Sequence, residues 1–133
     1  VHIVRMERMW IYVRSLNLTG KLPIYMELAD KIEEMVLDGI LEQNSQLESV
    51  REMANELAVN PNTIQKAYSE LERRGVIYSL NGKGSFISEN IEPIRDAKMA
   101  AITGKLEKLV FSLKKLGVGK EKILTVVDTV YCE

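Results

Sequence analysis

Two short helical patterns that follow each other almost without a break constrain this chain more than any other feature. The first covers about nine residues from Val50, and the second begins at Asn60-Pro61. Asparagine is a good helix N-cap, and proline fits the first helical position. So short a connection between two amphipathic helices is typical of a helix-turn-helix unit. The chain is therefore expected to present the start of a second helix on its surface.

The surrounding patterns predict a mainly α-helical fold with one small β-hairpin, an α+β arrangement. An apolar stripe with steps of three and four predicts a helix from about Pro23 to Gly39, followed by a loop over residues 44–49. Two β-prone runs, 76–80 and 85–88, flank Asn81-Gly82-Lys83-Gly84. Asn-Gly between such runs is a strong hairpin signal. A helix-turn-helix followed by a hairpin is a winged arrangement.

Three parts are expected along the chain. Residues 1–21 form an N-terminal tail, in which Trp10 to Leu18 is expected to be a strand that packs Trp10 onto the core. Residues 22–90 form the winged helix-turn-helix domain. Residues 91–133 form a short two-helix region, joined to the domain through the polar residues Ser88 to Pro93.

The C-terminal helices are expected to make a homodimer. Glycines 117 and 119 separate the first helix, after Pro93, from a second over Lys120 to Tyr131. The apolar residues of the first helix include a four-three spacing over about two heptads. Left exposed, such a stripe would be a large apolar patch, so a partner chain is favoured over packing back on the domain. The dimerisation residues are predicted to be Ile102, Leu106, Leu109, Val110, Leu113 and Leu116.

Composition argues against an enzyme, a metal site and a cofactor. Histidine occurs once, as His2, and cysteine once, as Cys132 next to the C-terminus. No nucleophile–base pair or zinc cluster can be assembled from them. No apolar run approaches the roughly 20 residues of a membrane span, and the predicted compartment is the cytoplasm.

Charge is segregated along the sequence although the net charge is only −1. Residues 22–44 carry one positive and six negative charges, whereas residues 93–133 carry eight positive and five negative. Nucleic-acid binding depends on a local basic face rather than on the total. A winged helix that binds only protein is the alternative, and the low net charge permits it.

The second helix of the unit begins with small polar side chains, the kind that can read DNA. In helix-turn-helix proteins this end of the recognition helix meets the bases. Amides pair with adenine, and threonine reaches a base edge or a thymine methyl. The Gly82-Lys83-Gly84 tip puts one cation on a loop narrow enough to approach a groove or a phosphate. The candidate helix residues are Asn60, Asn62, Thr63, Gln65 and Lys66.

These motifs together resemble a known family. The run from Ser49 to Gly75, the wing Gly82 to Phe86 and the opening Pro23-Ile24-Tyr25 are similar to the winged helix-turn-helix of GntR-type bacterial transcription regulators. The resemblance covers residues 23–88. Asn-Pro-Asn-Thr at 60–63, together with a tail of about 40 residues, resembles the YtrA subfamily, whose short C-terminal region mainly dimerises. The resemblance implies a DNA-binding regulator, often a repressor, that reads an inverted-repeat operator as a homodimer.

Residue roles follow from the resemblance position by position. Arg51, in the motif that begins at Ser49, matches an arginine that contacts DNA at the start of the first helix of the unit. Thr63 matches a phosphate or base contact, and Gln65 takes a position often held by a base-reading arginine. The wing tip of residues 82–84 matches the element that enters the minor groove.

The chain departs from the family pattern at three positions. Glu48 stands where proline is usual and puts an anion near the DNA-facing loop. Asn44 replaces a common glycine, and Pro61 replaces a DNA-contacting arginine of some subfamilies. These changes bear on which operator is read rather than on the fold.

Several residues have a structural interpretation instead. Asn60 is a cap before it is a contact, Tyr68 is expected in the core, and Arg73 and Arg74 are expected to be solvated or to lie against the carbonyl end of their helix. Two short helices cannot enclose a drug-sized pocket, so any small-molecule effector is expected at a subunit or domain interface. Its identity is not encoded in a readable motif.

Overall fold

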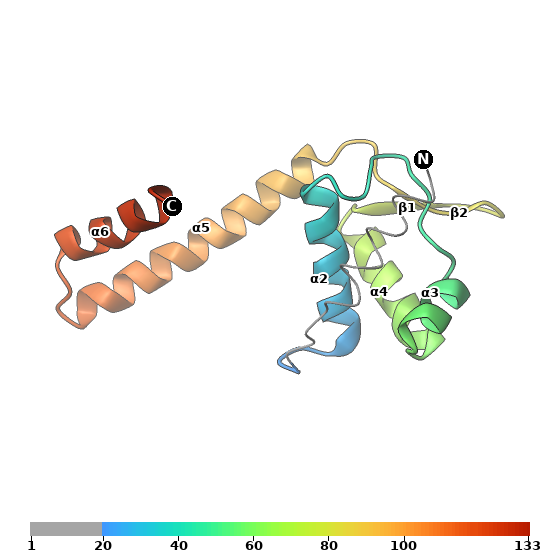
Figure 1. The fold of residues 1–133 in the computed structure, drawn as a ribbon, viewed down its shortest axis with the longest axis horizontal. Helices are drawn as coiled ribbons and strands as arrows, with labels where there is room; N and C mark the ends of the chain where they lie inside the picture. Colours follow the sequence, from blue (N-terminus) through green and yellow to red (C-terminus); the bar gives the residue numbers. More distant parts are fainter. Residues whose placement is uncertain (1–19) are drawn as a thin grey trace. The chain divides into compact units, whose positions relative to one another are not determined.

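The computed structural model describes residues 20–133 (Figure 1). The expected strand from Trp10 to Leu18 lies outside these residues. The described chain divides into two compact units, the first ending at Arg95 and the second covering Asp96–Glu133. Each unit is considered by itself below.

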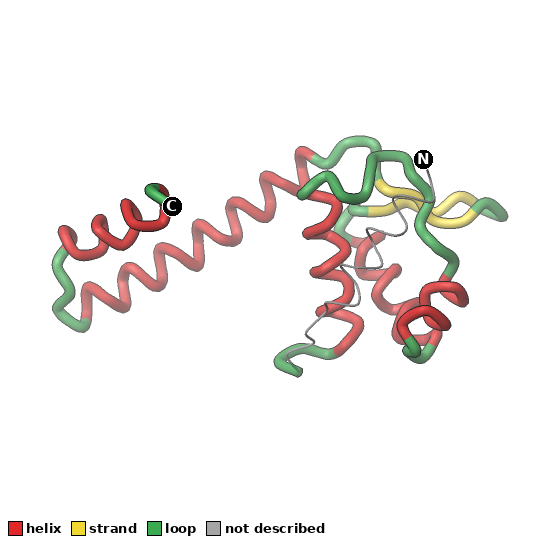
Figure 2. The backbone as a smooth tube through the Cα atoms, viewed as in Figure 1, coloured by secondary structure: helices red, strands yellow, loops and turns green. Residues whose placement is uncertain are grey.

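The first unit has the predicted combination of three helices and a two-stranded hairpin (Figure 2). The strands pair antiparallel, with Ile77 opposite Ile87 and Leu80 opposite Gly84, so a three-residue tip joins them. Residues 76 and 88, expected at the outer ends of the two strands, lie just outside them. The elements of this unit are α2 (Ile24–Leu37), α3 (Val50–Leu57), α4 (Pro61–Arg73), β1 (Ile77–Leu80) and β2 (Gly84–Ile87).

One apolar core holds the three helices and the hairpin together. The apolar stripe of α2 faces it, although Ile24 at the start of that stripe is 48% exposed. Burying an aliphatic side chain of this size contributes about 1.5–3 kcal/mol, so these contacts dominate the stability of the unit. The largest fully buried side chains are Ile32, Met35, Val36, Met53, Ile64, Leu71, Val76 and Ile87.

Glycines in the left-handed region follow two of the helices. Gly39 has φ +77° just after α2, and Gly75 has φ +79° just after α4. An L side chain is strained there, whereas glycine is not, so each glycine lets the chain leave its helix sharply.

Helix α5 (Glu92–Lys115) begins earlier than the sequence suggested. The side-chain oxygen of Asn90 accepts a hydrogen bond from the Glu92 amide at 3.1 Å. Ile94 is buried in the core of the first unit, and Arg95 Nη2 donates to the Leu37 carbonyl at 3.0 Å. The expected joint from Ser88 to Pro93 is therefore too long, because its last two residues already belong to an anchored helical turn.

The second unit contains the rest of α5 and helix α6 (Lys120–Tyr131), which matches the predicted bounds. Gly117 has φ +87° in the turn between them. Helix α6 buries none of its side chains. Cys132 is an exposed free cysteine at its C-terminal end.

Candidate nucleic-acid interface

The start of α4 presents polar side chains opposite its buried stripe. The Asn60 side-chain oxygen caps the helix by accepting the Asn62 amide at 2.8 Å. Asn62, Gln65 and Lys66 are exposed, whereas Thr63 is half-buried. Positions i, i+3 and i+4 share one helix face, so the three exposed side chains point outward together. Gln65 Nε2 lies 3.5 Å from Ser69 Oγ, a long contact that leaves the amide available to a ligand.

The turn between α3 and α4 is three residues long. Ala58 takes a left-handed conformation, with φ +52°, and the Val59 amide donates to the Ala54 carbonyl at 3.0 Å. At the other end of α3, the Ser49 hydroxyl accepts the Glu52 amide at 3.1 Å, which is one of the two hydrogen bonds of a capping box. Ser49 is thus a helix cap, and the exposed Arg51 stands in the first turn that it caps.

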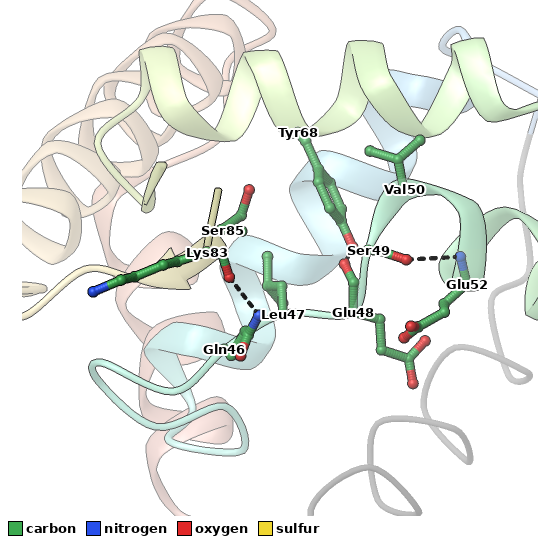
Figure 3. A pocket seen from close by; sticks show the side chains of 10 residues that line it. Gln46, Leu47, Glu48, Ser49, Val50, Glu52, Tyr68, Lys83 and Ser85 are labelled. Carbon is green, nitrogen blue, oxygen red and sulfur yellow. Dashed lines mark hydrogen bonds between the residues drawn. The ribbon is translucent and has the colours of Figure 1, made fainter. Parts of the chain in front are cut away.

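The hairpin is a wing with an exposed cation at its tip. Gly82 has φ +74° and Gly84 φ +108°, conformations that the tight tip requires. Tyr78 and Phe86 stack across the strands with ring centroids 5.6 Å apart, and the Tyr78 hydroxyl donates to Asn44 Oδ1 at 3.0 Å. Lys83 is exposed, and its ammonium points away from the other labelled residues of the cleft (Figure 3). The ring stack and this hydrogen bond therefore support the wing behind an exposed, charged side chain.

A cleft of about 610 Å³ connects the wing to the start of α3. Its walls are the segment Gln46–Val50, Glu52, Tyr68 and the wing residues Lys83–Ser85 (Figure 3). Of the predicted DNA-binding residues, Ser49, Lys83 and Gly84 line this cleft, and Arg51 stands between two residues that do. The candidates on α4 lie on an exposed face and do not line it.

Glu48 is buried in this region, which its position in a predicted loop did not indicate. The residue is 8% exposed, and Oε2 has no hydrogen-bond partner among the described residues. Burial raises the pKa of the Glu48 carboxyl, and the nearby carboxylates of Glu56 and Glu52 raise it further. Figure 3 shows the Glu48 and Glu52 carboxylates turned to the same side. The anion expected near phosphate is thus a costly buried group.

Tyr68 is a core residue, as predicted, and it ties α4 to this segment. Its hydroxyl donates to the Glu48 carbonyl at 2.7 Å. Burial raises the pKa of Tyr68, with the Glu48 and Glu52 charges adding to the effect. The phenol is therefore a neutral donor that fixes the backbone leading into α3.

Arg74 lies in an ion-pair network rather than in solvent, which corrects the expectation for this residue. Its guanidinium reaches Asp30 at 2.7 Å, Glu33 at 3.2 Å and Glu70 at 3.0 Å. Arg73 is exposed and pairs with Glu70 at 2.6 Å. Hydrogen bonds from Arg73 and Arg74 lower the pKa of Glu70 to about 2. Arg74 therefore links the end of α4 to α2, and its guanidinium is engaged there rather than at the candidate interface.

The described residues contain no cluster of His, Cys, Asp or Glu suited to a metal ion. Within the same part of the chain, no helix has both the length and the apolar character to cross a bilayer.

This fold and this exposed helix start define a winged helix-turn-helix protein. The family described as bacterial regulatory proteins, gntR family, matches residues 24–87. The HTH-type transcriptional repressor YtrA of Bacillus subtilis is 41% identical over 102 residues, which cover 76% of this chain and 78% of the relative. The chain belongs to the GntR family, and within it to the YtrA-like regulators.

Solved structures agree with this assignment. A transcriptional regulator from Oenococcus oeni has a TM-score of 0.76 and 37% identity, covering 88% of this chain and 98% of that one. YtrA from Sulfolobus acidocaldarius, a GntR-family transcription factor, has a TM-score of 0.57 and 31% identity, covering 70% and 96%. The fold class and the resemblance predicted from the sequence are thus confirmed. The relatives are transcription regulators rather than enzymes.

Proposed function

We propose that this protein is a sequence-specific DNA-binding transcription repressor that binds an inverted-repeat operator as a homodimer. The observation that carries the proposal is the exposed polar start of α4, in which Asn62, Gln65 and Lys66 share the face opposite the core. A recognition helix uses this end to reach base edges in the major groove. Such a repressor acts where the DNA is, in the cytoplasm.

The contacts divide into those that position the protein and those that read sequence. Arg51 and Lys83 carry exposed cations on α3 and on the wing, and both suit phosphate or the minor groove. The Gln65 amide suits bidentate pairing with adenine, and Asn62 and Thr63 offer further base or backbone contacts. Ser49 and Asn60 act first as caps, and Gly82 and Gly84 allow the wing backbone to come close.

A salt titration of duplex binding tests this proposal. Binding that neutralises phosphates must weaken steeply with salt, with a log–log slope near −0.9 for each phosphate. We expect a 30-base-pair duplex to bind at low salt and to dissociate between 50 and 200 mM salt, roughly as a protein with several phosphate contacts does. A shallow dependence without preference for duplex would favour the alternative, a winged helix that binds only protein.

Exposed apolar residues on α5, in the turn that follows it and on α6 support the homodimer. Leu109 is 64% exposed and Leu116 80%, and α6 has no buried side chain to stabilise its packing. A second copy of the same chain would cover these residues around a two-fold axis and would align two recognition helices with an inverted repeat. The predicted interface residues are Ile102, Leu106, Leu109, Val110, Leu113 and Leu116. A small-molecule effector stays a prediction.

Light scattering at micromolar concentration tests the dimer. Leu106→Glu places a charge in the predicted interface and should convert the dimer to a monomer, because a buried unpaired carboxylate is costly. Lys105→Glu is the matched control on the adjacent position and should leave the dimer intact. A wild-type chain that is monomeric under these conditions would refute this part of the proposal.

A further inference from the structure

The segment before α3, expected to be a loop, forms an isolated antiparallel bridge to strand β2 of the two-stranded wing. The Asn44 amide donates to the Ile87 carbonyl at 2.8 Å, and the Leu47 amide donates to the Ser85 carbonyl at 2.9 Å. The Ile87 amide in turn donates to the Ser45 carbonyl at 2.9 Å. Gln46 therefore stands opposite Phe86 in an antiparallel bridge. Its side chain starts from a backbone that is fixed relative to β2.

From this position the Gln46 side chain reaches the tip of the wing. Its Nε2 donates to the Lys83 carbonyl at 2.8 Å, 37 residues along the chain (Figure 3). The Lys83 amide already donates to the Leu80 carbonyl at 3.0 Å. Both backbone polar groups of Lys83 are thus held, one within the hairpin and one from outside it. Lys83 carries the cation of the wing tip that is expected to contact DNA.

Gly84 makes this contact sterically feasible. A Cβ built on Gly84 would lie 2.8 Å from Gln46 Nε2. Because that nitrogen ends a flexible side chain, a larger residue at 84 would displace the amide and break its bond to Lys83. Glycine at 84 therefore has two roles. It leaves room for the Gln46 amide, and it allows the left-handed backbone at φ +108°.

We propose that Gln46 is a positioning residue for DNA binding, which holds the wing tip so that Lys83 meets the duplex from a preset backbone. The inference rests on the proposed DNA-binding function and adds to it a residue that touches no DNA. Without this bond the tip must be ordered when DNA binds, and ordering a residue's backbone opposes binding. The expected loss is about tenfold in affinity, of the order of one ordered residue.

A double-mutant cycle with Lys83 separates this role from a general effect on folding. Gln46→Met keeps the length of the side chain and removes the donor. Gln43→Met, the same change at an exposed glutamine three residues earlier, is the matched control. Binding is measured by fluorescence anisotropy on a duplex that the wild-type chain selects from a random pool. Lys83→Met and Gln46→Met/Lys83→Met complete the cycle.

We expect Gln46→Met to weaken binding about tenfold, Gln43→Met to leave it unchanged, and the double variant to bind as Lys83→Met does. If the effects of the two substitutions on DNA affinity multiply, the two residues act independently and the inference is overturned. Wild-type affinity of Gln46→Met would overturn it as well. If Lys83→Met binds as the wild type does while Arg51→Ala does not, DNA binding stands and the positioning role of Gln46 falls. If the wild-type chain selects no duplex, the proposed function itself fails, and this role fails with it.

Discussion

Glu48→Gln should stabilise the protein at neutral pH, because it removes a charge from a buried site. The carboxylate is 8% exposed, has an oxygen without a partner among the described residues, and lies near Glu52 and Glu56. Leaving one buried polar group unsatisfied costs about 1–3 kcal/mol. A glutamine of the same shape still leaves a polar atom to satisfy, but removes the charge and its repulsion. We expect a gain of about 1 kcal/mol, a rise of roughly 4 °C in Tm for a chain of 133 residues.

The pH dependence of this gain has a definite sign. The pKa of Glu48 is raised above 4.5 in the folded state, so folding favours its protonated form. Well below pH 4.5 the carboxyl is protonated in both states, and wild type and variant should be nearly equally stable. As the pH rises from 4.5 through the folded pKa, the wild type loses stability that the variant keeps. The gap opens across this window and is constant above it.

Urea unfolding followed by circular dichroism of the helices measures this gap. Curves for the wild type and Glu48→Gln are compared at pH 4 and pH 7.5, at one protomer concentration because the proposed dimerisation would add to stability. Glu72→Gln, at an exposed position on α4, is the control and should change the free energy of unfolding by less than about 0.5 kcal/mol at either pH. Equal stabilities at pH 7.5, or a gap that persists at pH 4, would refute the reasoning.

Four further predictions concern the ion-pair network and the interface. Arg74→Met should lower the free energy of unfolding by about 2–4 kcal/mol, since three carboxylates lose their shared partner, and calorimetry at pH 7 checks it. Stability held by Glu70 should be lost as the pH falls from 4.5 through about 2, and Glu70→Gln should flatten that limb of an acid-unfolding curve. Arg51→Ala should weaken binding to every duplex and lower the salt slope by about one per subunit; an unchanged slope speaks against a phosphate contact. Gln65→Ala should cost about 1–3 kcal/mol at one base pair per half-site, and equal losses on selected and random duplexes would show that Gln65 does not read sequence.

The sequence by itself determined the helix-turn-helix, its caps and the hairpin. Asn60 caps α4 and Ser49 caps α3 through residues two or three positions away. Gly39 after α2 and Gly75 after α4 let the chain leave each helix, because glycine adopts a positive φ without strain. These signals act within about one helical turn, and all the information they need is contiguous in the sequence. The same local pattern carried the family resemblance, which the comparisons confirmed.

Only the tertiary structure decided which polar residues are free to act. Arg73 and Arg74 are neighbours in sequence, but Asp30 and Glu33 on α2 take Arg74 out of solvent. Glu48 is buried and Gln46 reaches the wing because a stretch without a strand pattern pairs with β2. These partners lie 37 to 44 residues apart. No short-range periodicity encodes such contacts, since they exist only after the core has brought the elements together.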